Sequence, residues 1–373
     1  MSKIINIICF SDISWDLLWQ RQQQLLTRLP SSWKIMVLEP MSFQGLKEKP
    51  TSIFPRRKKN LIFISLPIIP PLEKHRITRK IDDLFVFLYI RIFTCIFNIK
   101  RPVLLFYEPR FSSLVGFFNE RLVWYEYIDN KLGFSWVPGW MKYYNDLLIK
   151  KAGVVTASSK SLYENARSKG AKNVHLVGNA VDMEHFKNKP AHIRKDLSGL
   201  KKPVIGYVGA ISDWFDFELI ERAAVRFPDF TFLLVGPIQH EMIKKSFLLK
   251  KNDNIIFTGK KRYDELPLFI SQFDVAIIPF QINELTNYVN PVKLYEYLAA
   301  GKPVVSTALP DIDEFKEVIY IANDHEEFMQ CIINALENKQ ISDKYIDILR
   351  NNNWDKRAEQ VTNLIRNYFI EES

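Results

Sequence analysis

The sequence is poor in cysteine and shows no pattern of metal ligands. Its 373 residues include three cysteines, Cys9, Cys95 and Cys331, which lie far apart and without the spacing of a metal site. The six histidines show no ligand spacing either. We therefore expect three buried thiols in a reducing compartment, and neither residue type indicates a bound metal.

Two glycine-rich phosphate motifs are missing as well. No Gly-x-Gly-x-x-Gly follows any predicted strand, and the Walker A pattern does not occur. These absences disfavour both a nicotinamide cofactor and a nucleotide held by a P-loop.

No hydrophobic run is long enough to span a bilayer. The nearest candidate, residues 84–97, is shorter than the roughly 20 residues that a span needs, and Arg91 interrupts it. Residues 1–16 contain too short an apolar run for a signal peptide and lack a small-residue cleavage site. We therefore expect a cytoplasmic protein.

Positive charge is concentrated in the first half of the chain. The net charge is +9, but residues 1–190 carry 29 Lys and Arg against 15 Asp and Glu, whereas the remainder carries 22 against 27. Basic clusters at residues 55–59 and 74–80 precede the apolar run at residues 84–97. This combination predicts peripheral attachment to an anionic membrane surface at the inner membrane face. The alternatives are a solvated lysine-rich surface, or a helix buried against a sheet with the basic residues in loops.

Short apolar segments alternate with helical segments along the chain. In the first half, strands are predicted over residues 4–10, 34–40, 60–67, 103–109 and 122–129, and helices over residues 15–29 and about 140–152. Continuous apolar strands of this kind predict an α/β fold of doubly wound parallel sheets, covered by helices on both faces. The length fits two domains, residues 1–187 and 204–353, joined by a polar linker at residues 188–203.

The strands of the second half end in glycine, at Gly209, Gly236 and Gly259. A glycine at the carboxyl end of a parallel strand lets a ligand approach the backbone closely. Three such glycines indicate a binding edge, although glycine also ends strands for reasons of turn geometry.

The stretch NPVKLYEYLAAGKPVV predicts a helix from Pro291 to Ala300, because proline suits a first turn and the following glycine suits a helix end. Lys293 and Glu296 lie on one face of it. A helix N-terminus with a lysine attracts phosphate, and a carboxylate there would bind a ribose diol. The pair therefore predicts a nucleoside diphosphate site; the alternative is a surface ion pair.

Residues 291–305 have the form P-x-K-x-x-E-Y-x-A-x-G-x-P-V-V, which resembles the donor-binding signature of GT-B glycosyltransferases of the family 4-like group. Residues 154–186, 258–280 and 354–369 resemble other parts of that family. Residues 11–26 resemble the opening of a subgroup that makes bacterial surface polysaccharides. The resemblance covers nearly the whole chain.

The resemblance implies two Rossmann-like domains that face each other across a cleft. The N-terminal domain (1–187) would bind the acceptor and the C-terminal domain (204–353) the nucleotide-sugar donor, and the last helix (354–373) would pack back on the first domain. Such enzymes generally work without a metal or other cofactor, so we expect none.

By position, the resemblance assigns Lys293 to the donor diphosphate and Glu296 to the ribose. The other donor-binding residues that it implies are Gly209, Lys261, Tyr263, Thr286 and Asn290. The sequence departs from the family in three places. Ala180 replaces a glycine, Tyr288 stands where many members have a second glutamate, and the loop at residues 209–218 carries no basic residue.

Catalysis of glycosyl transfer needs a stabilised leaving group, which is the predicted role of Lys293. An inverting enzyme also needs a base at the acceptor hydroxyl. Asp129 ends a predicted strand, where subgroup relatives carry an aspartate pair, and is our candidate for the base or a sugar ligand; the alternative is a turn aspartate. The residues predicted on the acceptor side are Asp16, Arg21 and Gln24, with Asp12, Glu108 and Arg110 as weaker candidates. For Arg21 the alternative is a solvent-facing helical arginine.

These observations predict a glycosyltransferase that moves a sugar from a UDP-sugar to a lipid-linked or polysaccharide acceptor in bacterial cell-surface glycan synthesis. A sugar-nucleotide epimerase of the same fold and a non-catalytic module that binds sugar nucleotides or polyanions remain as alternatives. Nucleic acid is not an expected partner, because the basic residues do not form a recognisable module with exposed aromatic residues.

Overall fold

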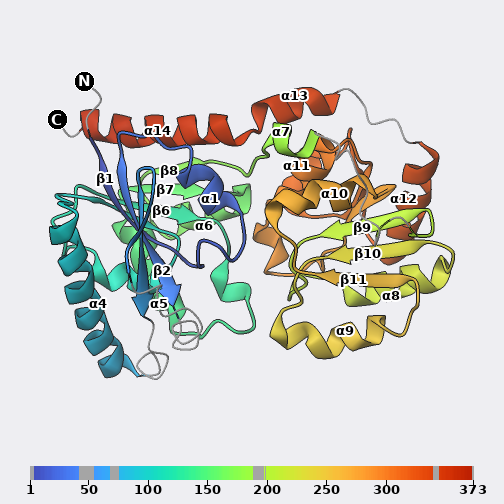
Figure 1. Cartoon of the computed structure of the whole chain (residues 1–373), viewed down its shortest axis with the longest axis horizontal. Coiled ribbons are helices and arrows are strands. Elements are labelled where there is room, and N and C mark those ends of the chain that lie inside the picture. Colours follow the sequence, from blue (N-terminus) through green and yellow to red (C-terminus); the bar gives the residue numbers. More distant parts are fainter. Residues whose placement is uncertain are drawn as a thin grey trace. The chain divides into compact units, whose positions relative to one another are not determined.

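The chain forms two compact units in a computed structural model that describes residues 4–41, 54–67, 75–187, 197, 199–338 and 344–371 (Figure 1). The first unit comprises residues 1–132, 136–177 and 358–373, and the second comprises residues 133–135 and 178–357. Most of the predicted linker at residues 188–203 lies outside the described residues.

An eight-stranded sheet forms the centre of the first unit, in the order β3-β4-β2-β1-β5-β6-β7-β8. The strands are β1 (Asn6–Phe10), β2 (Lys34–Met41), β3 (Arg56–Lys58), β4 (Leu61–Pro67), β5 (Val103–Phe106), β6 (Leu122–Tyr127), β7 (Val154–Ala157) and β8 (Val174–Leu176). All neighbours pair in parallel except β3 and β4, which pair antiparallel. The basic cluster at residues 55–59 thus contributes an exposed edge strand.

Helices cover both faces of this sheet. They are α1 (Arg21–Leu26), α4 (Arg76–Ile96), α5 (Met141–Lys151), α6 (Lys160–Ser168) and α14 (Trp354–Glu371). Val361, Ile365 and Phe369 of α14 are buried in one core with side chains of the sheet, and Figure 1 shows α14, in red, alongside the strands of this unit.

The first predicted helix is much shorter than expected. Helix α1 begins at Arg21 rather than at Trp15. Residues 15–17 form a turn ahead of it, in which the backbone N–H of Trp15 donates to the carboxylate of Glu39, 2.6 Å away. A capping box formed by Gln20 and Gln23 then starts α1.

Helix α4 is amphipathic rather than buried on all sides. Val86 and Ile90 are buried, while Leu84 and Leu88 are more than half exposed. Cys95 is exposed on this helix, so the prediction of three buried thiols is wrong for Cys95 and correct for Cys9 and Cys331. No described helix is both long and apolar enough to cross a membrane.

The second unit has a six-stranded sheet in the order β11-β10-β9-β12-β13-β14, with all neighbours parallel. Its strands are β9 (Val204–Val208), β10 (Thr231–Val235), β11 (Ile255–Gly259), β12 (Val275–Ile278), β13 (Val304–Thr307) and β14 (Tyr320–Ala322). Its helices are α7 (Met183–Lys187), α8 (Phe217–Arg226), α9 (Ile243–Leu249), α10 (Leu266–Ser271), α11 (Val292–Ala299), α12 (His325–Glu337) and α13 (Lys344–Asn351).

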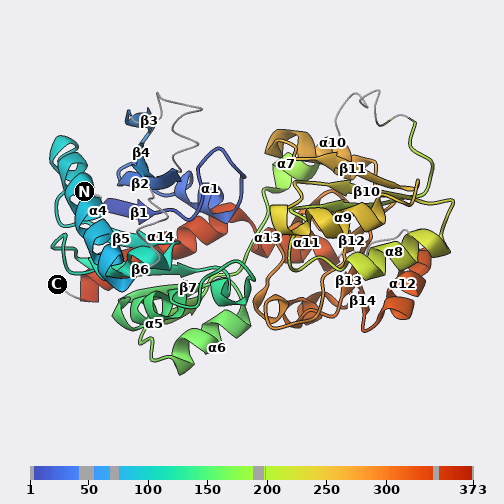
Figure 2. The same ribbon diagram turned by 90° about the horizontal axis from the view of Figure 1, so that it is seen from below.

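Helices lie on both faces of the second sheet as well (Figure 2). Packing at its centre is close, since a Cβ added to Gly206 in β9 would come within 2.0 Å of the ring of Phe273. The prediction of an α/β fold with two doubly wound parallel sheets is therefore confirmed.

Candidate functional site

Each sheet has a switch point. This is a pair of neighbouring strands from which the sheet extends in opposite directions along the chain. In the first unit these strands are β1 and β5, and in the second they are β9 and β12. Ligands of doubly wound sheets bind beyond the carboxyl ends of the strands at such a point. The residues that follow these strands are therefore the candidates for function.

In the second unit, helix α11 starts near the switch point, as the sequence predicts. Its first helical residue is Val292, with Pro291 as the N-cap and Gly301 in the left-handed region (φ +66) beyond its end. Lys293 therefore lies in the first turn, where backbone N–H groups are free to bind an anion.

The ammonium group of Lys293 lies against aromatic rings. Its Nζ atom is 4.5 Å from the centre of the Phe280 ring and 5.5 Å from that of Tyr207. Burial lowers the pKa of Lys293 to about 8, and the nearby charge of Glu296 opposes this shift. The cation is thus held in place by cation–π contacts rather than by a carboxylate.

Glu296 shares this environment. Burial raises its pKa to about 7, and the charge of Lys293 opposes the shift. Among the ion pairs of the described residues none joins Lys293 to Glu296, which does not support the alternative of a surface ion pair. An anionic ligand would supply the opposite charge that Lys293 lacks, and would favour its protonated form.

Two of the three strand-end glycines are required by close packing. Gly209 has φ +150, and a Cβ there would lie 2.8 Å from the Tyr207 hydroxyl and 3.0 Å from Cε of Lys293. A Cβ at Gly236 would meet the carbonyl oxygen of Gly209 at 2.0 Å. Gly259 has φ +70, but a Cβ there would meet nothing within 4 Å. The structure thus brings Gly209 and Lys293 together.

Lys261 and Tyr263, two of the predicted donor-binding residues, follow β11. The ring of Tyr263 stacks on His185, with centroids 4.2 Å apart and an interplanar angle of 6°. Lys261 lies over Phe269, with its Nζ atom 5.2 Å from the ring centre. The stacking of His185 on Tyr263 fits a structural role for this histidine.

Thr286 and Asn290 form hydrogen bonds within the second unit. The Thr286 hydroxyl accepts from the backbone N–H of Asn283, 3.0 Å away. The Asn290 side-chain oxygen accepts from the backbone N–H of Asn179 and from the Tyr295 hydroxyl, both at 3.2 Å. We therefore assign both residues to shaping the loop before α11. Sequence reasoning missed Asn179 as the partner of Asn290, because it lies 111 residues away.

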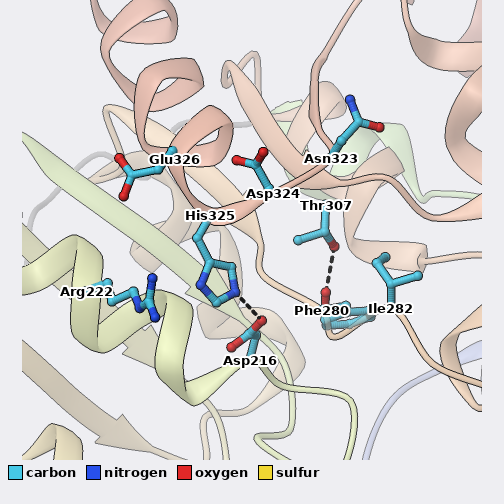
Figure 3. Close-up of a pocket in the computed structure, with 9 residues that line it drawn as sticks. All are labelled: Asp216, Arg222, Phe280, Ile282, Thr307, Asn323, Asp324, His325 and Glu326. Carbon is cyan, nitrogen blue, oxygen red and sulfur yellow. Dashed lines mark hydrogen bonds and ion pairs between the residues drawn. The ribbon is translucent and has the colours of Figure 1, made fainter.

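A pocket of about 440 Å³ lies at the carboxyl ends of β12, β13 and β14, next to the first residues of α8 and α12. Figure 3 shows His325 of α12 pointing toward Asp216, whose carboxylate lies 3.0 Å from its Nε2 atom. Phe280, whose ring Lys293 contacts, also lines this pocket. Asp216 caps α8 through the N–H of Leu219, so its carboxylate already has protein partners.

The first unit has an acidic cluster at its switch point. It contains Asp12 after β1, Glu108 after β5, and Asp129 and Lys131 after β6. Lys131 Nζ lies 3.0 Å from the Glu108 carboxylate and 3.4 Å from that of Asp12. Burial alone would lower the pKa of Lys131, but these two carboxylates raise it well above its usual range.

Asp129 is the carboxyl group of this cluster whose pKa burial raises. Burial raises its pKa to about 7, Lys131 and Arg21 oppose the shift, and Asp12 adds to it. A carboxyl group that titrates near neutral pH suits a general base. Sequence reasoning found Asp129 as a strand-end residue, but gave no signal for Lys131, whose role depends on three separate strands.

The predicted acceptor residues lie in three different environments. Arg21 is buried, with its Nε 2.7 Å from the buried carboxylate of Glu126, so the alternative of a solvent-facing arginine is wrong. Gln24 is buried and accepts from the guanidinium group of Arg28 at 2.6 Å. Asp16 is exposed and pairs with Arg56 at 3.0 Å.

Comparison with known proteins points to a single family for part of the chain. The family described as Glycosyl transferases group 1 matches residues 202–338. TuaH of Bacillus subtilis (strain 168), whose name assigns it to glycosyl transfer in teichuronic acid biosynthesis, is 36% identical over 185 residues, which are 48% of this chain and 47% of TuaH. The 2-deoxystreptamine glucosyltransferase of Streptomyces kanamyceticus is 30% identical over 172 residues, 43% of each chain. The chain thus spans less than half the length of these curated relatives.

Solved structures match over nearly the whole chain. Sucrose-phosphate synthase from Thermosynechococcus elongatus has a TM-score of 0.79 at 16% identity, covering 98% of this chain and 100% of that one. HepE from Anabaena in complex with UDP-glucose has a TM-score of 0.71 at 13% identity, covering 97% and 100%. A protein from Listeria monocytogenes described as a UDP-N-acetylglucosamine 2-epimerase has a TM-score of 0.61 at 13% identity, covering 99% and 98%. At such identities these likenesses establish the fold, which is GT-B.

Proposed function

The chain carries a group 1 glycosyltransferase domain at residues 202–338 within a GT-B fold, and from this premise we propose that it transfers a sugar from a UDP-sugar to a lipid-linked or polysaccharide acceptor in cell-surface glycan synthesis. The observation that carries the proposal is the position of Lys293. Its ammonium group lies in the first turn of α11, beside Gly209 and against two aromatic rings.

The donor diphosphate binds at the start of α11. Lys293 and the free N–H groups of the first turn neutralise the phosphate oxygens, and Glu296 accepts hydrogen bonds from the ribose. As the bond from sugar to diphosphate breaks, negative charge grows on the leaving group, and these fixed donors stabilise it. UDP complexes of HepE, a protein of the same fold, support the choice of uridine.

Asp129 deprotonates the acceptor hydroxyl in this mechanism. Its pKa of about 7 matches the pH at which a cytoplasmic base must work. Lys131 positions Glu108 and Asp12 around it, and Arg21 contributes positive charge from the buried side. Asp16, the exposed acceptor-side candidate, would contact the glycan.

The acceptor is proposed to be lipid-linked because of the basic first half of the chain, and a glycan because the name of TuaH links that relative to teichuronic acid biosynthesis. The enzyme would then work as a peripheral protein at the inner face of the membrane.

Thermal denaturation with nucleoside diphosphates tests the donor site. A ligand that binds only the folded chain adds about 2.7 kcal/mol of stability at a hundredfold excess over its Kd. We expect UDP, rather than GDP, ADP or dTDP, to raise the melting temperature, and Lys293→Ala to lose the response. Lys244→Ala, which removes an exposed lysine of α9, is the matched control. If UDP fails to stabilise the wild-type chain, the donor site is refuted.

The epimerase alternative rests on the fold alone, since its structural relative is only 13% identical. Incubation of UDP-N-acetylglucosamine without acceptor, followed by NMR of the sugar, separates the two activities. An epimerised donor would replace our proposal, whereas binding of UDP without turnover of any sugar donor would favour a non-catalytic module.

A further inference from the structure

Helix α4 exposes a continuous apolar stripe. Its members are more than 45% exposed and follow the spacing of one helix face; they are Ile77, Ile81, Leu84, Phe85, Leu88, Ile92 and Ile96. The opposite face, which includes Val86 and Ile90, is buried against the first unit. From Ile77 to Ile96 the stripe extends about 28 Å. An exposed apolar surface of this length on a single helix marks an interaction site.

The stripe carries positive charge at its border and no negative charge. Arg76, Lys80 and Arg91 are exposed along one side of it. The two acidic residues of α4 point inward, where Asp82 and Asp83 pair with the buried guanidinium group of Arg110 at 3.0 and 2.6 Å. The sequence places two carboxylates in this helix, but the fold removes both from its outer face.

The surface continues beyond α4. Phe117 is 56% exposed and its ring packs edge-on against Phe87 of α4, with centroids 5.4 Å apart. Lys100 and Arg101 follow the helix and are exposed. In both ribbon views α4 lies at the margin of the first unit (Figures 1 and 2).

We propose that the outer face of α4 docks on an anionic membrane surface, with its apolar stripe in the headgroup region and its basic border against lipid phosphates. An amphipathic helix with a basic edge lies in the plane of the interface instead of crossing it. Charge complementarity selects this occupant, since every exposed charged residue of α4 is basic and lies beside the apolar stripe. The inference deepens the proposed function, because a peripheral enzyme with a lipid-linked acceptor needs a docking surface.

Binding to vesicles tests the proposal on the full chain. We expect the protein to sediment with vesicles of phosphatidylcholine and phosphatidylglycerol in equal parts, more weakly with pure phosphatidylcholine, and less at high salt. Leu84→Ser combined with Leu88→Ser should lower the partition coefficient about tenfold. Val225→Ser, which removes an exposed valine of α8, is the control and should bind as the wild type does.

The basic border is tested separately. Lys80→Gln combined with Arg91→Gln should remove the preference for phosphatidylglycerol and leave the weak binding to phosphatidylcholine. Equal binding of wild type and of the Leu84 and Leu88 variant would overturn the proposal. So would a wild-type dimer in sedimentation velocity that this variant converts to a monomer, because the stripe would then be a self-association surface.

The same samples distinguish this inference from the proposed function. The UDP-dependent rise in melting temperature should persist in the Leu84 and Leu88 variant. If UDP stabilises it and wild-type vesicle binding is absent, only the docking surface is wrong. If vesicle binding depends on the stripe but UDP has no effect, the donor site is wrong and the membrane surface remains.

Discussion

The two units present different chemistry at the same topological position. At the switch point of the second unit, Lys293 lies against Phe280 and Tyr207 without a carboxylate partner in hydrogen-bonding range. At the switch point of the first unit, Lys131 lies between Glu108 and Asp12, 3.0 and 3.4 Å away. Lys293 is therefore available to an anionic ligand, whereas the charge of Lys131 is already neutralised by its neighbours.

This difference indicates how the units divide the work. A lysine held by aromatic rings keeps its charge available for a diphosphate. A lysine enclosed by carboxylates is a structural group that orders an acidic cluster, in which burial raises the pKa of Asp129 to about 7. Substitutions in each unit therefore test this division of roles.

The largest effect is expected for Asp129→Asn. If Asp129 is the base, the variant should lower the transfer rate about 10²–10⁴-fold and leave UDP binding unchanged. Its melting temperature should rise rather than fall. Burial raises the folded pKa from 3.8 to about 7, so ionisation costs stability above pH 7, and that cost disappears as the pH falls toward 3.8. A loss of both activity and stability would indicate a structural aspartate.

Gly209→Ala should weaken the donor site of the second unit. The new Cβ at φ +150 would meet the Tyr207 hydroxyl at 2.8 Å and Lys293 Cε at 3.0 Å, so we expect a cost of about 1–3 kcal/mol and weaker UDP binding. Gly259→Ala is the matched control, with φ +70 and open space around its Cβ, and should cost about 1 kcal/mol. Chemical denaturation and calorimetric UDP titration measure both. An equal loss of UDP affinity in the Gly209→Ala and Gly259→Ala variants would show that Gly209 is not part of the donor site.

UDP affinity should have a maximum between about pH 7 and pH 8. Above this window Lys293, with a pKa of about 8, loses its proton and its attraction for phosphate. Below it Glu296, with a pKa of about 7, becomes protonated and a weaker acceptor for ribose hydroxyls. On each side of the maximum, the Kd for UDP should rise by up to about tenfold per pH unit. Calorimetry over a pH series tests this, and Glu296→Gln should flatten the acidic limb only.

The smallest effect is expected for Asp16→Ala. Asp16 and Arg56 form an exposed pair, so its loss should change the free energy of unfolding by about 0.5 kcal/mol or less. A rise in the KM for the acceptor, with unchanged KM for the donor, would support its predicted acceptor role. Unchanged kinetics would leave Asp16 as a surface residue and confine acceptor binding to the buried cluster.

Much of the fold and of the donor site follows from local sequence. Continuous apolar runs such as Ile7 to Phe10 predicted strands of a covered parallel sheet. Pro291 and Gly301 predicted the limits of α11 to within one residue, and thereby the place of Lys293 in its first turn. These features depend on residues within a few positions of each other, so backbone preferences alone specify them.

Other features depended on residues far apart in the sequence. The backbone N–H of Trp15, ahead of α1, donates to Glu39, 24 positions away, and the buried Arg21 pairs with Glu126, 105 positions away. The outer face of α4 is free of negative charge because Arg110 turns Asp82 and Asp83 inward.

The sequence by itself determined the two parallel sheets, the helix that carries Lys293 and the absence of a P-loop. Only the tertiary structure decided which charges remain available. In the sequence, Lys131 and Lys293 are both single lysines after or near a strand. The carboxyl ends of β1 and β5 bring carboxylates to Lys131, whereas those of β9 and β12 bring aromatic rings to Lys293. Burial and neighbouring charge set the pKa of a side chain, and both are properties of the folded chain.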